Sequence, residues 1–185
     1  FGIDREQIFV YPFGTDVHHF APGPDEGERG ALEVGNAPVV ISTRTLNPVH
    51  DVTTFIKAIP VISDAFPSVR FVVAGDGTDR TRLEALASEL GVSTATRFTG
   101  MVDENRMRSL LRVADVYVST SVADAGLAAS TAEAMATALP VVQTDNSDNA
   151  SWAPEGEGGF LIPNGDHLAL ATAVCRLLSD GDMRA

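Results

Sequence analysis

The chain has 185 residues, of which 44% are hydrophobic, and a formal net charge of −12 at pH 7. This length suits one α/β domain with a proper core and is too short for two ordinary domains, so we expect a single domain over residues 1–185. The sequence has no apolar run long enough to span a bilayer, and its acidity disfavours nucleic acid or an anionic membrane surface as a direct partner.

The first residues include neither a secretion signal nor an initiating Met, so we expect a cytoplasmic chain that is part of a larger protein. Its basic residues are twelve Arg and a single Lys, Lys57. High acidity with little lysine fits a salt-adapted cytoplasm, and it equally fits an ordinary acidic bacterial protein. The one cysteine, Cys175, has no disulfide partner and is expected to be a small core residue.

Short apolar runs alternate with amphipathic segments along the chain. The apolar runs, which we predict to be strands, are Ile8–Tyr11, Pro38–Ser42, Val69–Ala74, Thr96–Thr99, Val116–Val118, Pro140–Val142 and Gly159–Ile162. The helical patterns cover roughly 51–65, 79–91, 103–112, 128–138 and 166–179. Most of the strands are too apolar for one face to meet water, which predicts a buried parallel sheet.

Several residues mark where the predicted helices begin and end. Three acids stand at N-cap positions: Asp51, Asp103 and Asp166. Pro60 is expected to kink or shorten the first helix, and Gly91 to end the second. Residues 21–37 are rich in Gly, Pro and Glu and are predicted to form a surface loop.

The alternation of strands and helices predicts a Rossmann-like, doubly wound α/β domain with a parallel sheet and helices on both faces. Ligands of such sheets bind at the carboxyl ends of the strands. We therefore expect five loops to converge on one crevice; they contain Gly14, Arg44, Gly75–Gly77, Gly100–Val102 and Asp124–Ala129.

The segment from Ser119 to Gln143 carries the clearest functional pattern. A strand leads through the small-residue turn Asp124–Leu127 into a helix of Ala, Ser, Thr and Met that contains one acid, Glu133. Free N–H groups and the helix dipole attract an anion at such a helix start. Glu133 can accept two vicinal hydroxyls of a sugar, or a hydrogen bond from a neighbouring backbone N–H. Phosphate and sugar together point to a nucleotide-sugar.

Arg44 and His50 follow the second predicted strand. A guanidinium fork suits a pyrophosphate, and an imidazole can add a weaker donor. The alternatives are a structural arginine and a loop histidine without a role. His18 and His19 are adjacent on a loop, and we do not expect them to bind a metal.

The sequence Gly75-Asp-Gly-Thr-Asp-Arg80 partly matches a dinucleotide-binding fingerprint. It lacks the third glycine and follows the third strand, whereas the fingerprint belongs to the first strand-to-helix turn. We interpret it as a tight connection that lines a nucleotide crevice.

An ordered set of motifs covers nearly the whole chain: Tyr11–Val17, Ile41–Leu46, Val72–Gly77, Arg97–Gly100, Ala114–Thr120, Glu133–Ala136, Leu139–Val142 and Gly158–Pro163. This set resembles the C-terminal half of a family 4 glycosyltransferase of the GT-B fold. The resemblance implies a retaining transfer of a sugar from a UDP-, GDP- or ADP-sugar. The acceptor, which is a glycan, a lipid-linked molecule or another compound, would bind to an N-terminal domain outside this chain. The full protein could lie at the inner face of the cell membrane.

The resemblance also implies roles for individual residues. Arg44 would bind the diphosphate and Glu133 the ribose hydroxyls. Backbone amides of the turn would hold the phosphates; this turn comprises Gly126, Leu127, Ala128 and Ala129. The loop from Gly100 to Val102 would lie against the base. No metal or other cofactor is expected, because Arg44 and the helix start would balance the phosphate charge.

Three positions depart from the family pattern. Ala125 stands where the family has an acid that holds the donor sugar, and Asp124 could serve instead if the turn is one residue longer. His50 stands near the place of a lysine, and Ala138 near the place of a glycine. Two other hypotheses are a nucleotide-sugar 2-epimerase and a non-catalytic nucleotide-binding or scaffold module.

Overall fold

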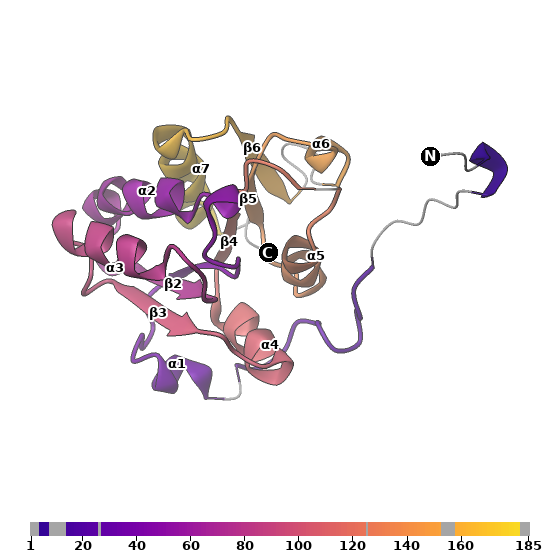
Figure 1. Ribbon diagram of the computed structural model, residues 1–185. Helices are drawn as coiled ribbons and strands as arrows, with labels where there is room; N and C mark the ends of the chain where they lie inside the picture. The colour runs from indigo at the N-terminus through magenta and orange to yellow at the C-terminus, as the bar shows by residue number, and fades with distance from the viewer. Residues whose placement is uncertain (1–3, 8–13, 26, 125, 153–157, 182–185) are drawn as a thin grey trace.

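A computed structural model describes residues 4–7, 14–25, 27–124, 126–152 and 158–181. Six parallel strands form one sheet in the order β3-β2-β1-β4-β5-β6 (Figure 1). Their bounds are β1 Val39–Ser42, β2 Arg70–Ala74, β3 Thr96–Gly100, β4 Val116–Ser119, β5 Val141–Thr144 and β6 Gly159–Ile162. The six correspond to the last six predicted strands, and the predicted strand at 8–11 lies outside the described residues.

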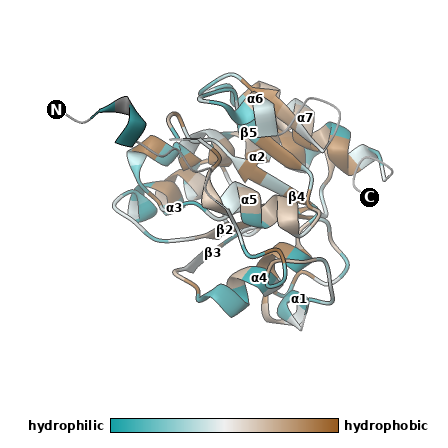
Figure 2. Cartoon of the chain, turned by 90° about the vertical axis from the view of Figure 1, so that its right-hand side faces the viewer, coloured by the Kyte–Doolittle hydropathy of each residue, from teal (hydrophilic) through white to brown (hydrophobic). Residues whose placement is uncertain are grey.

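Helices cover both faces of the sheet, as a doubly wound fold requires. The helices are α1 Glu28–Ala31, α2 Val52–Ala65, α3 Arg80–Glu89, α4 Glu104–Val113, α5 Ala129–Ala136, α6 Asn149–Trp152 and α7 His167–Ser179, with short 3-10 turns η1 Arg5–Gln7 and η2 Pro48–His50. One core joins the sheet to α2, α3 and α7, and a second joins it to α4, α5 and the segment around α1. In Figure 2 the strand β5 and helix α2 are largely hydrophobic, and α5 is paler because Ser, Thr and Glu alternate with its Ala and Met residues.

Burial on both faces explains why the strands are continuous apolar runs. All four residues of β1 are buried, and Val40 and Ile41 point into opposite cores. The same alternation recurs in β4, where Tyr117 enters the second core and Val118 the first. A strand that is packed on both faces has no polar side, so its hydrophobic pattern lacks the alternation of a half-exposed strand.

The order of strands places a switch point between β1 and β4. The chain moves outward from β1 through β2 to β3, then returns to pair β4 with the other side of β1. The connections after β1 and β4 run to opposite faces of the sheet, and this leaves a crevice between them at the carboxyl ends of the central strands. The loops after β1 and β4 therefore meet there.

Two of the three predicted N-caps are confirmed. The carboxylate of Asp103 accepts the N–H of Arg106 (2.9 Å), and that of Asp166 accepts two N–H groups of α7. Asp51 precedes α2 but makes no such bond, because the turn η2 ends there and holds it at φ 39°. Its carboxylate accepts the hydroxyl of Thr54 instead (2.5 Å).

Other local predictions were partly wrong. Helix α2 is not shortened at Pro60 but continues to Ala65, because it packs against α7 and α3 along a buried face. Gly91 follows α3 with φ 72°, as expected of a C-terminal glycine. The predicted loop 21–37 contains α1, since Leu32 and Val34 enter the second core. Cys175 is partly buried against the first core. Among the described residues no helix is long and apolar enough to cross a membrane.

Candidate active site

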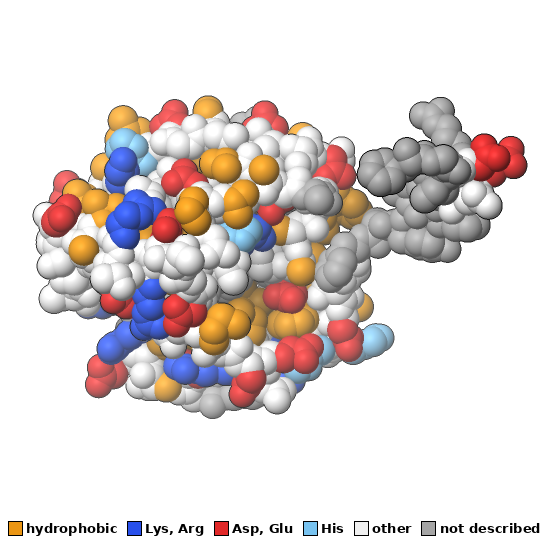
Figure 3. Space-filling model, in the orientation of Figure 1, with side chains coloured by type: hydrophobic (Ala, Val, Ile, Leu, Met, Phe, Trp, Pro, Cys, Tyr) orange, Lys and Arg blue, Asp and Glu red, His pale blue; other side chains and the backbone are white. Residues whose placement is uncertain are grey.

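A cavity of about 420 Å³ opens at the carboxyl ends of β1 and β4. Its lining residues are Thr43, Arg44, Thr45, His50, Asp124, Ala128, Ala129, Ser130 and Glu133. They come from the loop after β1, the turn η2, the loop after β4 and the first half of α5. Figure 3 shows the molecule from the side seen in Figure 1. On this face many acidic side chains lie near the outer edge of the molecule, and most of the visible Lys and Arg side chains lie on the left, over α3 and below it.

The loop after β2 holds the loop after β1 from behind. Leu46 N–H donates to the Asp76 carbonyl and Asp79 N–H to the Leu46 carbonyl, each at 2.9 Å. A Cβ on Gly75, whose φ is 143°, would lie 2.4 Å from the carbonyl oxygen of Arg44. Glycine is therefore required here for close approach of two backbones, and this approach fixes the start of the Arg44 side chain.

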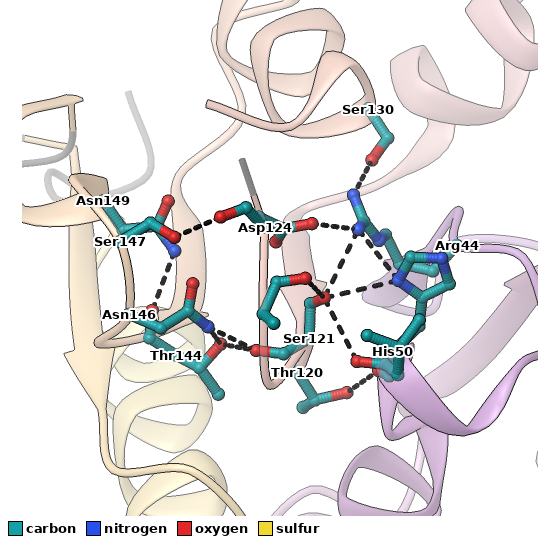
Figure 4. A network of polar contacts seen from close by, with 12 residues as sticks. Arg44, His50, Thr120, Ser121, Asp124, Ser130, Thr144, Asn146, Ser147 and Asn149 are labelled. Carbon is teal, nitrogen blue, oxygen red and sulfur yellow. Dashed lines mark hydrogen bonds and ion pairs between the residues drawn. The ribbon is translucent and has the colours of Figure 1, made fainter. Parts of the chain in front are cut away.

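Arg44 is buried, with 8% of its side chain exposed, and polar groups surround its guanidinium (Figure 4). Nη2 donates to Asp124 Oδ1 (2.5 Å) and to His50 Nδ1 (2.9 Å), while Nη1 donates to Ser130 Oγ (3.0 Å). Nη2 also lies 3.4 Å from Ser121 Oγ. One guanidinium thus joins three elements of the cavity wall.

Asp124 belongs to a loop that the end of β5 and the residues after it hold in place. The hydroxyl of Ser147 donates to the Asp124 carbonyl, and Thr144 and Asn146 both donate to the Ser121 carbonyl (Figure 4). These three residues were not singled out from the sequence. Small polar residues directly after a buried strand of the same sheet were the signal that could have found them.

His50 is an acceptor toward Arg44. A guanidinium only donates, so Nδ1 must carry a lone pair, and in the neutral ring the proton lies on Nε2. Burial lowers the pKa of His50, the charge of Arg44 lowers it further, and Asp124 opposes both. A neutral imidazole with an Nε2 donor is therefore the favoured state.

Helix α5 begins at the cavity without a side-chain cap. Ala128 is its extended N-cap residue, and the first-turn N–H groups of Ala129 and Ser130 face no capping side chain. Such groups and the helix dipole attract an anion. Gly126, with φ 96°, and Leu127 form the turn that leads into the helix. Of the four predicted turn residues, Ala128 and Ala129 line the cavity.

Glu133 lies one turn further along α5 and completes the lining. It is half-buried, and within the described residues its carboxylate has no hydrogen bond or ion pair. The alternative of a bond to a neighbouring backbone N–H is therefore not observed. Burial raises the pKa of Glu133, the negative charge of Glu104 raises it further, and His19 opposes them.

The remaining predicted residues do not line the cavity. Gly75 and Gly100 form a second layer, joined by the Gly75 N–H and the Gly100 carbonyl at 2.9 Å. Val102 is partly buried against the second core. Gly14 is exposed and is not part of the lining. Two of the five expected loops line the wall, and two others hold it.

The described part of the chain contains no group of three or more His, Cys, Asp or Glu side chains that could hold a metal ion.

Residues 37–180 match the family model for glycosyl transferases group 1. Among curated proteins, the chain is 32% identical over 192 residues to a D-inositol 3-phosphate glycosyltransferase of Corynebacterium urealyticum, covering 97% of this chain and 45% of that protein. It is 30% identical over 172 residues to the putative glycosyltransferase EpsD of Bacillus subtilis, covering 91% of this chain and 44% of EpsD. The chain thus spans less than half the length of these relatives.

Solved structures show the same fold. The HepE protein of Anabaena, crystallised with UDP and glucose, superposes with a TM-score of 0.86 at 23% identity, over 99% of this chain and 50% of HepE. The C-terminal domain of LpcC from Francisella tularensis matches with a TM-score of 0.75 at 23% identity, over 92% of this chain and 91% of that domain. The chain belongs to the glycosyl transferases group 1 family and has the fold of the C-terminal domain of a GT-B glycosyltransferase.

Proposed function

We propose that this chain is the donor-binding domain of a retaining glycosyltransferase and that it binds a UDP-, GDP- or ADP-sugar. One observation carries the proposal. A single cavity joins a buried arginine and an uncapped helix start to a half-buried carboxylate that has no hydrogen-bond or ion-pair partner among the described residues. A nucleotide-sugar offers the complement of both, a diphosphate and a ribose diol.

The diphosphate would bind at the end of the cavity that contains Arg44. The guanidinium supplies charge and directed donors, and the first turn of α5 supplies backbone N–H groups. His50 can add its Nε2 proton, since its Nδ1 already accepts from Arg44. We propose that these groups balance the phosphate charge without a metal ion.

The ribose would bind at Glu133. Ser130 and Glu133 are three positions apart on α5 and so lie on one face of the helix, about 5–6 Å apart at their Cβ atoms. Ser130 contacts Arg44, where the phosphates would bind, and Glu133 lies next to it on the same helix. A nucleotide whose phosphates contact Arg44 would therefore place its ribose beside Glu133. An ionised carboxylate only accepts hydrogen bonds, and two adjacent hydroxyls are suitable donors.

We further propose that transfer needs a second domain. The chain covers less than half of its curated relatives, and one of them, in Mycobacterium leprae, is named a phosphatidyl-myo-inositol mannosyltransferase. We propose that the acceptor is a glycan or a lipid-linked molecule, which accords with that name. It would bind outside this chain, in the cytoplasm or at the inner face of the membrane. Closure of two domains excludes water from the reacting groups, so the isolated domain is expected not to turn over.

Calorimetry with UDP, GDP and ADP tests the donor site. We expect Glu133→Gln to weaken binding about 10–100-fold, the equivalent of losing charge-assisted hydrogen bonds. Glu84→Gln is the matched control: it removes the same charge from α3, outside the cavity lining, and is expected to bind as the unchanged protein does.

A nucleotide lacking the 2′-hydroxyl makes this test specific. The deoxynucleotide should bind the unchanged protein more weakly than the ribonucleotide, and Glu133→Gln should bind the two almost equally. If no nucleotide binds, or if the 2′-hydroxyl matters equally in both proteins, the proposed donor site is wrong and a non-catalytic scaffold becomes the better reading.

A further inference from the structure

The arginine proposed to bind the diphosphate already holds an anion. Asp124 Oδ1 lies 2.5 Å from Arg44 Nη2, and the two side chains are 11% and 8% exposed. Nη1 donates to Ser130, and Nε is buried with no hydrogen-bond partner among the described residues. A phosphate approaching Arg44 therefore meets a guanidinium whose charge is balanced.

The charges that line the cavity do not favour a further anion. Arg44 is positive, Asp124 and Glu133 are acids, and His50 is held toward its neutral form. With both acids ionised the lining carries one net negative charge. A diphosphate gains full electrostatic attraction from Arg44 only if Asp124 moves away.

The described contacts hold the backbone of this loop and leave the Asp124 carboxylate attached only to Arg44. The loop is anchored at the carbonyls of Ser121 and Asp124 by the last residue of β5 and two residues that follow it. The Asp124 carboxylate itself has Arg44 as its one hydrogen-bonding partner among the described residues. Rotation of one side chain would release it into the cavity.

We propose that Asp124 is a specificity-determining residue that competes with the diphosphate for Arg44 and so selects the intact nucleotide-sugar over the free nucleoside diphosphate. This inference rests on the proposed function. Once displaced, the carboxylate needs hydrogen-bond donors. The sugar of an intact donor supplies hydroxyls, whereas a free diphosphate presents only oxygens and negative charge. The product of transfer is therefore held weakly and leaves the site.

Calorimetry of Asp124→Asn with UDP and with inorganic pyrophosphate tests the competition. The variant keeps the shape of the side chain but removes its charge, so we expect both ligands to bind about tenfold more tightly. The affinity for UDP-glucose, the nucleotide-sugar used as probe, should increase less than the affinity for UDP. The ratio of the two affinities should therefore favour UDP-glucose less in Asp124→Asn than in the unchanged protein.

Asp148→Asn is the matched control. Asp148 lies beside the same turn, with Oδ1 3.6 Å from the Cβ position of Gly126, but it does not contact Arg44. Asp148→Asn removes one negative charge near the site, as Asp124→Asn does. Because Asp148 is exposed and its charge is screened by solvent, the UDP affinity is expected to change less than about twofold. An equal gain in both variants would mean that general repulsion, and not the ion pair, limits binding.

The His50 ring reports the ion pair directly. Asp124 raises the pKa of His50 against the effects of burial and Arg44. Titration of the ring by NMR should therefore give a lower pKa in Asp124→Asn than in the unchanged protein. An unchanged pKa would show that the carboxylate does not stay on Arg44 in solution and would overturn the proposal.

The outcomes separate this inference from the donor site itself. If UDP binds and Glu133→Gln weakens it, but Asp124→Asn binds UDP no better, the donor site stands and the competition is refuted. If neither the unchanged protein nor Asp124→Asn binds any nucleotide, the proposed function fails first. Thermal unfolding of Asp124→Asn shows whether the variant remains folded.

Discussion

The charged side chains at the two ends of the cavity differ in their hydrogen bonding. Arg44 is buried and its two terminal nitrogens hydrogen-bond to side chains of the cavity wall, including an acid from a loop 80 positions away. Glu133 is half-buried and has no hydrogen bond or ion pair within the described residues. A protein normally pairs a charge that it removes from water. The unpaired end is therefore suited to accept hydrogen bonds from a ligand, and the paired end is a contact that an anionic ligand would have to replace.

Removing Arg44 should have the largest effect. Arg44→Gln leaves Asp124 with no ionic partner in a site that is mostly closed to water, and we expect a loss of about 3–5 kcal/mol in the free energy of unfolding. Urea denaturation measures this loss. Nucleotide binding should disappear in the same variant.

The double variant Arg44→Gln/Asp124→Asn separates the two effects. Without the unpaired acid, most of the stability should return, while nucleotide binding should remain lost. If the double variant is as unstable as Arg44→Gln, the loss comes from packing and not from the ion pair, and the contrast between the two ends is weaker than described.

Gly75→Ala should have the next largest effect. The new Cβ would clash with the backbone carbonyl of Arg44 at a φ of 143°, and we expect a loss of about 2–4 kcal/mol by chemical denaturation. Gly30→Ala is the control, because no atom lies within 4 Å of its Cβ position and it lies in α1. It should be neutral or slightly stabilising; an equal loss in both variants would contradict the role of the loop contact.

Ala138→Gly should stabilise the far end of the helix that lines the cavity. Ala138 follows α5 with φ 61°, a left-handed conformation that costs a residue with a Cβ about 1–2 kcal/mol. Part of that gain is lost because glycine has more freedom when unfolded, so we expect about 1 kcal/mol of added stability. Nucleotide affinity should not change. Ala150→Gly in α6, where no such strain exists, should lower stability; a loss at Ala138 as well would rule out the strain.

Much of the fold could be predicted because its signals are local. Buried strands such as Val39–Ser42 are short runs of β-branched residues, and Asp103 and Asp166 mark helix starts within three residues. Sequence periodicity did not predict α1, because four residues are too few to show a period. Asp51 is the N-cap residue of α2, as predicted, but its side chain does not cap the helix, and its left-handed backbone conformation cannot be recognised from its identity alone.

Site residues could be predicted where their residue type and local position indicate a role. Contacts between residues far apart in the sequence could not be predicted. Arg44, His50 and Glu133 follow from chemistry at the ends of predicted strands and in one helix, and all three line the cavity. The ion pair with Asp124 joins residues 80 positions apart, and the close approach at Gly75 joins two backbones. Neither leaves a local pattern. Gly100 and Val102, which were expected to lie against the base, are not among the residues that line the cavity, because a loop at the correct edge can still lie one layer behind the wall.

The smallest effect concerns the pH dependence of stability at Glu133. Burial, then the charge of Glu104, raises its pKa in the folded protein above the ordinary value of 4.5. The folded state thus holds the proton more tightly than the unfolded state, and the free energy of unfolding falls as pH rises through the interval from 4.5 to the raised pKa. Above that interval the unpaired charge destabilises the fold.

Glu133→Gln has no charge to desolvate, so it should be slightly more stable than the unchanged protein at pH 7. The difference should close as the pH falls below 4.5, where Glu133 is protonated in both states. Urea denaturation of both proteins between pH 4 and pH 7 measures it, and the other carboxylates cancel in the comparison. Since the same variant is expected to lose nucleotide affinity, stability and binding should move in opposite directions. A variant that is less stable at pH 7 would show that Glu133 has a favourable partner in the empty cavity, and the ribose would then have to displace it.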